Sequence, residues 1–128
     1  MSTEHDYHID MDALARDNED FRRVLMTGDK MQIVAMTIQP GEEIGAETHE
    51  GHDQVLYFTA GIGEAVLDGE RFGIRAGHLV LVRAGVHHNF INTGDEPLRI
   101  VTAYAPPEHE AGTVHADKAE ADAAEHDH

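Results

Sequence analysis

Between Phe21 and Ala105 the chain alternates short apolar runs with polar turn sequences. The runs are rich in Val, Ile, Leu, Tyr, Phe and Thr, and sequences such as TGDK, PGEE, LDGE and NTGDEP separate them. Short runs of β-branched and aromatic residues with turns between them are typical of antiparallel strands. The pattern predicts strands at 21–26, 31–39, 46–50, 54–60, 63–68, 71–74, 78–83, 88–92 and 98–105.

The number and spacing of these strands favour an all-β sandwich or small barrel over a helical fold. One hairpin is defined by its turn, because Asp68 and Gly69 in VLDGERF can adopt the positive φ values that a tight two-residue turn requires. A chain of 128 residues with 41% apolar content is sufficient for one compact core. The residues expected in this core or in a pocket wall include Met36, Tyr57, Phe58 and Phe90.

The two ends of the chain lack the strand pattern. The stretch DMDALARDNED, residues 10–20, predicts a short helix. The last residues, ADKAEADAAEHDH, are rich in alanine and charge but have no apolar stripe, which is typical of a frayed helix or a disordered tail. We therefore expect an N-terminal arm over 1–20, a β-barrel over 21–106 and an acidic, partly disordered C-terminal segment over 107–128.

Composition narrows the partners and the chemistry. The formal net charge is −16 at pH 7, and Lys and Arg form no cluster, which opposes binding to nucleic acid or to anionic membrane surfaces. The chain has neither an apolar run of membrane-spanning length nor the features of a signal peptide, so we expect a cytoplasmic protein. With no cysteine, a metal site would have to use imidazole, carboxylate, amide or water ligands.

A polar cluster, ETHEGHDQ, directly precedes the apolar run VLYF. Glu47 and His49 are two residues apart, so in a strand their side chains point to the same side. His87 and His88 lie on opposite faces of a later strand, so one of them can point inward. The amide oxygen of Gln54 can reach the same point if its strand runs antiparallel to that of Glu47. These residues predict a small polar site inside the fold.

At these positions the sequence resembles the cupin superfamily. The first cupin motif has a glycine, two histidines separated by one residue, a glutamate and, seven residues later, another glycine. Counting back from Gly61 places Gln54 at the glutamate position and Glu47 and His49 at the histidine positions. The second motif is similar to GHLVLVRAGVHHNFIN, where Gly77, Gly85, His88 and Asn92 keep the spacing and Arg83 replaces a usual proline. The resemblance covers roughly residues 18–118, and it is to small single-domain bacterial cupins.

The resemblance implies a small jelly-roll barrel that holds one divalent transition metal, Mn, Fe, Ni, Co or Zn, per chain. The implied ligands are Glu47, His49, Gln54 and His88. Two of them depart from the usual three histidines and one glutamate, yet both sets carry a single negative charge. Gln54 would be a weak neutral ligand, or would hydrogen-bond a bound water or substrate instead. His52 is either a solvated loop residue or a substitute ligand.

The function that follows is metal-dependent cupin chemistry on a small oxygen-bearing molecule, by oxygenase, isomerase or lyase action. A non-catalytic small-molecule or metal-binding cupin, or a structural dimer without a metal, are the alternatives. The residues do not decide whether the protein is an enzyme, because one fold hosts many functions. We also expect a homodimer, since open sheet edges need covering, by the N-terminal arm or by the strand at 31–39.

Overall fold

The structure of the protein, a computed structural model, describes residues 8–126. It is built almost entirely from strands, with one short helix before them and one after them. In chain order the elements are α1 Met11–Asp17, β1 Arg22–Thr27, β2 Gln32–Ile38, β3 Glu47–Thr48, β4 Asp53–Ala60, β5 Ile62–Leu67, β6 Glu70–Arg75, β7 Leu79–Val82, β8 His87–Asn92, β9 Leu98–Ala105, β10 Val114–His115 and α2 Lys118–His126.

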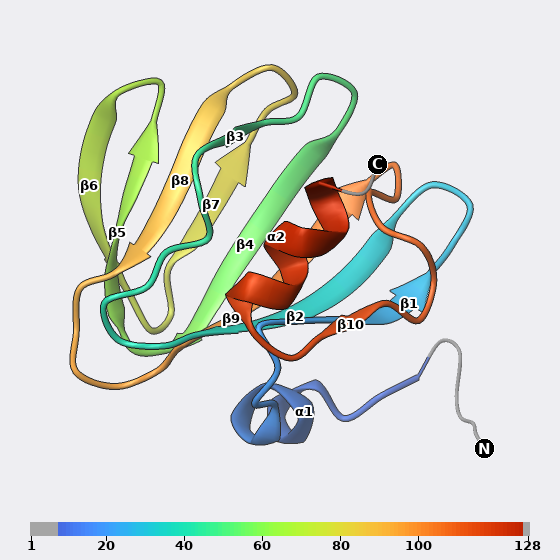
Figure 1. Cartoon of the computed structure of the whole chain (residues 1–128), viewed down its shortest axis with the longest axis horizontal. Helices are drawn as coiled ribbons and strands as arrows, with labels where there is room; N and C mark the ends of the chain where they lie inside the picture. Colours follow the sequence, from blue (N-terminus) through green and yellow to red (C-terminus); the bar gives the residue numbers. More distant parts are fainter. Residues whose placement is uncertain (1–7, 127–128) are drawn as a thin grey trace.

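The strands form two antiparallel sheets that face each other in a jelly roll (Figure 1). The six-stranded sheet has the order β10-β1-β2-β9-β4-β7, and the four-stranded sheet has the order β3-β8-β5-β6. The expected all-β jelly-roll fold is therefore confirmed. Among residues 8–126, no backbone ladder joins the edge of one sheet to the edge of the other, so the arrangement is a two-layer sandwich.

All nine predicted strands are present, each within two residues of its expected ends. The predicted hairpin joins β5 to β6, with Leu67 opposite Glu70 and positive φ angles at Asp68 (49°) and Gly69 (86°). The sequence analysis missed β10, because a two-residue strand has no recognisable pattern. β10 adds to the outer edge of β1, where Arg22 lies opposite His115.

The apolar core lies between the two sheets. Phe58 from β4 and Phe90 from β8 are fully buried, and their ring centroids are 5.7 Å apart. Met36 is also buried, as expected, but the prediction for Tyr57 is wrong, because its side chain is 45% exposed. Successive strand residues point to opposite faces, so once Phe58 points into the core its neighbour Tyr57 must point outward.

The chain passes from the six-stranded sheet to the four-stranded sheet at Gly61. Its φ angle of +96° is one that side chains disfavour, and a Cβ atom there would lie 2.7 Å from the carbonyl oxygen of Pro97. A larger residue would thus clash with the loop before β9. The glycine spacing used in the sequence analysis therefore has a steric cause.

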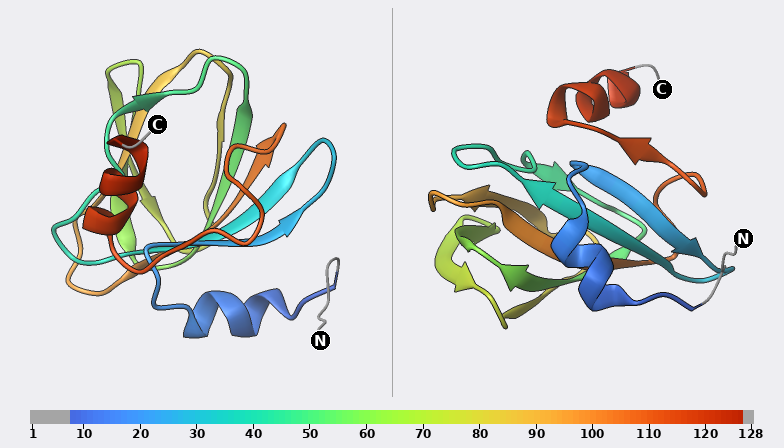
Figure 2. Two further views of the ribbon diagram at one scale, coloured as in Figure 1. Left: turned by 45° about the vertical axis from the view of Figure 1, so that its right-hand side comes forward. Right: turned by 90° about the horizontal axis from the view of Figure 1, so that it is seen from below.

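The segment that joins β9 to β10, residues 106–113, is called here the connecting segment. The buried side chain of Gln32 binds its backbone: Nε2 donates to the oxygen of His109 (2.7 Å), and Oε1 accepts from the nitrogens of Glu108 (3.2 Å) and His109 (3.0 Å). Helix α2 follows, with Ala121 only 1% exposed against the core. Figure 2 shows β10 and α2 on one side of the sandwich, with α1 separate from them.

The structure bears on two expected properties, pairing with a second copy of the chain and contact with membranes. β2 is hydrogen-bonded on both sides, to β1 and β9, so the strand at 31–39 has no free edge to offer a second chain. The N-terminal arm lies partly outside the described residues. No helix within residues 8–126 combines the length and apolar character needed to cross a membrane.

Candidate metal centre

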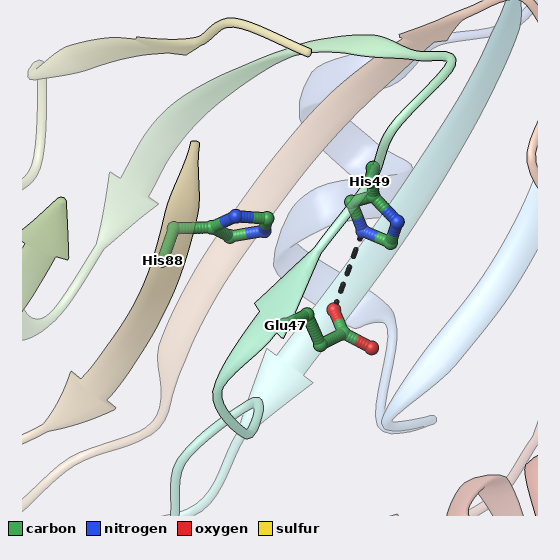
Figure 3. A group of neighbouring side chains, drawn as sticks. All are labelled: Glu47, His49 and His88. Atoms are coloured by element: carbon green, nitrogen blue, oxygen red, sulfur yellow. Dashed lines mark ion pairs between the residues drawn. The ribbon is translucent and has the colours of Figure 1, made fainter. Parts of the chain in front are cut away.

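Three of the four predicted ligands converge at one end of the sandwich (Figure 3). Glu47, His49 and His88 each offer one ligand atom, and these atoms lie within 4.8 Å of one another. The register of the sheet explains the convergence, because Glu47 on β3 lies directly opposite His88 on β8. Of the adjacent histidines on β8, His88 is 2% exposed and His87 is exposed, as the alternation of the strand predicts.

The ring of His88 is oriented by its own backbone. Its Nδ1 lies 2.9 Å from the carbonyl oxygen of Val86. A carbonyl only accepts hydrogen bonds, so Nδ1 must carry the proton and Nε2 keeps its lone pair for a ligand. Burial also lowers the pKa of His88, chiefly because it disfavours the charged ring. His88 is therefore a neutral imidazole at neutral pH, the form that binds metals.

Glu47 carries the negative charge of the group. Its Oε1 lies 3.4 Å from Nε2 of His49. Burial by itself raises the pKa of Glu47, but the interaction with His49 and the positive charge of Arg22 outweigh it, so the net pKa is lowered. The side chain is therefore an ionised carboxylate at neutral pH.

Gln54 lies on β4 in the opposite sheet, so it does not pair with the strand of Glu47. The hydroxyl of Thr102 donates to Val55 O (2.8 Å), and therefore accepts at 3.0 Å from Nε2 of Gln54. This fixes the orientation of the amide and leaves Oε1 of Gln54 buried with no hydrogen-bond partner. A buried acceptor without a donor is unfavourable unless a ligand or water satisfies it. Its role as a weak fourth ligand stays a prediction.

His52 is neither a freely solvated loop residue nor a member of the converging group. Its Nδ1 lies 2.7 Å from the oxygen of Pro106, and its Nε2 lies 3.0 Å from Oε1 of Glu108. The second oxygen of Glu108 lies 3.6 Å from Nδ1 of His49, which is long for a hydrogen bond but close enough for electrostatic attraction. Glu108 thus sits between two imidazoles and helps to orient His49.

A cavity of about 520 Å³ opens beside Glu47 and His49. Sequence reasoning missed most of its wall, which comes from the connecting segment, β10 and β1. The only signal was PPEHE, a group of titratable residues just after the last long strand. The lining residues are Arg22, Glu47, Thr48, His49, Glu108, His109, Glu110, Thr113, His115 and Ala124.

Two further histidines in the cavity wall are held neutral. Burial lowers the pKa of His109 to about 3, and the nearby positive charge of Arg22 adds to the effect. Burial and the charge of Arg22 also lower the pKa of His115. The ring of His109 packs edge-on against Tyr104, with centroids 5.3 Å apart. These rings therefore give the cavity polar atoms without adding charge.

The donor set suits a divalent transition metal. Two imidazoles and one carboxylate that converge from one side can bind Fe, Mn, Co, Ni or Zn and leave positions open for other ligands. The open side here is the cavity, because Glu47 and His49 form part of its wall. The buried Oε1 of Gln54, which has no hydrogen-bond partner, is also consistent with a bound metal or with a water on that metal.

Comparison with known proteins agrees with this geometry. YrkC, an uncharacterised protein of Bacillus subtilis, is 38% identical over 91% of this chain, which spans 66% of the length of YrkC. The crystal structure of BH2720 from Bacillus halodurans matches with a TM-score of 0.90 and 36% identity, covering 94% of this chain and 96% of that one. The crystal structure of a predicted oxalate decarboxylase from Thermotoga maritima matches with a TM-score of 0.59 and 25% identity, and the match covers 62% of this chain and 69% of that one.

The model of one family, the cupin domain, matches residues 34–104. This range runs from β2 to β9 and includes Glu47, His49, Gln54 and His88. Together with the two-sheet jelly roll, it establishes that the chain belongs to the cupin domain family.

Proposed function

We propose that this cupin is a metal-dependent enzyme that binds a small oxygen-bearing molecule at a divalent transition metal. The metal, one per chain, would be held by Glu47, His49 and His88, with Gln54 as a weak fourth ligand. The observation that carries the proposal is the approach of the three ligand atoms to within 4.8 Å of one another. Such a metal would supply Lewis acidity, and in the case of Fe or Mn also redox chemistry.

The side chains around this group support a catalytic site more than an isolated metal site. Glu47 and His49 face a cavity of about 520 Å³, which is large enough for a small molecule. Glu108 orients the ring of His49 by its charge, and the carbonyl of Val86 orients that of His88. Oriented ligands beside an open cavity are what oxygenase, isomerase or lyase chemistry requires.

The relatives support the same class of small molecule. The Thermotoga maritima structure is described as a predicted oxalate decarboxylase, which points to a small oxygen-bearing acid. Because its identity to this chain is 25%, it supports the class and not the compound.

The first experiment measures bound metal by mass spectrometry on untagged protein, after reconstitution with Mn, Fe, Co, Ni and Zn in turn. About one metal per chain is expected, and none with any of the five would refute the proposal. Glu50→Gln is the matched control for Glu47→Gln, because Glu50 is exposed in the same stretch. Turnover of candidate small acids by the loaded protein would then separate an enzyme from a module that only binds.

We also propose a homodimer that uses the outer face of β4 and β7. Three large apolar residues are exposed there, Tyr57 (45%), Leu79 (65%) and Leu81 (54%), and β7 is an edge strand that can pair with its own copy. Light scattering should return about twice 14.1 kDa. Leu81→Lys should give a monomer, whereas Ile62→Lys, at a residue 59% exposed on β5, should not.

The cytoplasmic location and the exclusion of nucleic acid and membranes remain predictions from composition. The division into segments 1–20, 21–106 and 107–128 is likewise a proposal. It can be tested by limited proteolysis, which should cut outside residues 21–106 first.

A further inference from the structure

We propose that Arg22 and His109 form a carboxylate-binding subsite in the cavity beside the metal-binding group. The substrate would then be a small organic acid held at two points, with its carboxylate on Arg22 and its other oxygen atoms toward Glu47, His49 and His88. This inference rests on the proposed function and narrows its substrate class.

Arg22 is a buried cation with no counter-ion among the side chains that the structure describes. The residue is only 3% exposed, yet among residues 8–124, whose side chains the structure describes, no carboxylate lies within 4.0 Å of its guanidinium. In that part of the chain its guanidinium makes one hydrogen bond, from Nη1 to Nδ1 of His115 (3.2 Å). Its Nε is buried with no hydrogen-bond partner. A buried unpaired charge is costly, so a residue kept in this state indicates a ligand that completes it.

The neighbours of Arg22 do not neutralise it. His115 is held neutral by burial and by the charge of Arg22, so it accepts a hydrogen bond but supplies no negative charge. The ring of Phe21 lies 5.3 Å from Cζ, which stabilises a cation only weakly. Arg22 is thus held in place on one side, and among the described residues its Nη2 makes no hydrogen bond.

His109, which also lines the cavity, carries a second unsatisfied atom. Its Nε2 is buried with no hydrogen-bond partner, and its backbone is fixed by Gln32. Both Arg22 and His109 line the cavity that Glu47 and His49 also line. A ligand in this space can therefore meet a cationic donor and a neutral imidazole on one side, and the metal-binding group on the other.

A carboxylate fits this surrounding better than a phosphate. A guanidinium matches the planar, two-oxygen geometry of a carboxylate. Glu47, Glu108 and Glu110 line the same cavity, and their charges oppose a group that concentrates its negative charge at one point, as a phosphate does. A dicarboxylate spreads its two charges over two carboxylates, of which one would lie at Arg22 and the other toward the metal-binding group. Arg22 and Glu47 both line the cavity, and no ion pair joins them in the described part of the chain.

Isothermal titration calorimetry with acetate, malonate and inorganic phosphate, on metal-free and metal-reconstituted protein, tests the subsite. Malonate should bind saturably and more tightly than phosphate, and Arg22→Gln should weaken its binding at least tenfold. Arg23→Gln is the matched control, because Arg23 is the adjacent exposed arginine on the other face of β1, and it should bind malonate as the unaltered protein does. Equal malonate affinity in Arg22→Gln and the unaltered protein would overturn the proposal.

Two further measurements make the test independent of folding and of the metal. The Nε–H signal of Arg22 in NMR spectra of the unaltered protein should shift as malonate is added; no shift at saturation would also overturn the proposal. If Arg22→Gln does not fold, Arg22→Lys should still weaken malonate binding, because lysine keeps the positive charge but lacks the paired N–H donors of the guanidinium. Metal affinity in Arg22→Gln should be no lower than in the unaltered protein, because a nearby positive charge has been removed. Normal metal binding without malonate binding would refute only the subsite, and absent metal binding would refute the proposed function.

Discussion

The two sides of the candidate site are held by different kinds of interaction. Glu47 and His88 lie opposite each other in a backbone ladder between β3 and β8. Glu108 and His109 lie in the connecting segment, which forms no strand and whose backbone at these two residues is bound by the side chain of Gln32. A ladder changes only if a strand moves, whereas a side-chain clamp can be removed by one substitution. The metal-binding side should therefore be rigid and the cavity wall adjustable.

Because the two sides are held differently, metal affinity and ligand preference should depend on different residues. Metal affinity should depend on β3, on His49 directly after it and on β8, and ligand preference on residues of β1 and the connecting segment. Glu108 is the link between the two, because its carboxylate lies 3.6 Å from Nδ1 of His49 and 3.0 Å from Nε2 of His52. Substitutions on each side test the separation.

The largest effect is expected on stability, from loss of the hydrogen bonds that the side chain of Gln32 makes to the connecting segment. Gln32→Ala removes three hydrogen bonds to the backbone of Glu108 and His109 and a fourth to the hydroxyl of Thr27. Since these groups are partly buried, the free energy of unfolding should fall by about 2–4 kcal/mol, measured by urea denaturation. Hydrogen exchange should accelerate first in the connecting segment. Gln39→Ala, at an exposed glutamine, is the control, and equal loss in both variants would contradict the clamp.

Next in size is the loss of the carboxylate that the metal would use. Glu47→Gln leaves two imidazoles and neutral amides, so metal affinity should fall at least tenfold, or about 1.4 kcal/mol. Gln54→Glu should act in the opposite direction, because it adds a negative charge at the usual cupin position. Competition with a chelator of known affinity measures both. Unchanged affinity in Glu47→Gln would show that the ligand set is wrong.

A smaller effect on metal affinity is expected from the linking residue. Glu108→Gln removes the charge that faces His49 but leaves all ligands in place, so affinity should fall by about threefold to tenfold. Glu110→Gln is the control, because Glu110 is an exposed residue of the same segment. A loss in Glu108→Gln as large as that in Glu47→Gln would mean that the two sides of the site are not separable.

The smallest effect is a pH dependence of stability from His109. Burial lowers its pKa from 6.5 to about 3, so below pH 6.5 the unfolded chain binds a proton that the folded protein does not. Stability is therefore complete above pH 6.5 and is lost as the pH falls toward 3. Between pH 7 and 6 the loss from this residue should be less than about 0.7 kcal/mol. Urea denaturation of metal-free protein should show a shallower decline in His109→Gln, and an identical decline would contradict the assignment.

The strand pattern and the converging group were within reach of sequence reasoning because both depend on local rules. The alternation of side chains brings Glu47 and His49 to one side of the chain and separates His87 from His88. The positive φ angles of Asp68 and Gly69 follow from their residue types. Tyr57 was misplaced because an apolar run alone does not show which alternate set of residues points inward, and Phe58 is the buried one.

The sequence by itself determined the class of fold, the ends of nearly every strand and the four residues that we propose as metal ligands. Those properties follow from the period of the strands, the turn residues and the motif spacing. Only the tertiary structure decided that Gln54 lies across the interior from β3, that His52 contacts Glu108 and that Arg22 is buried with no counter-ion among the described side chains. These outcomes depend on contacts between residues far apart in the chain, such as Arg22 with His115 and Gln32 with His109, and no local pattern encodes such contacts.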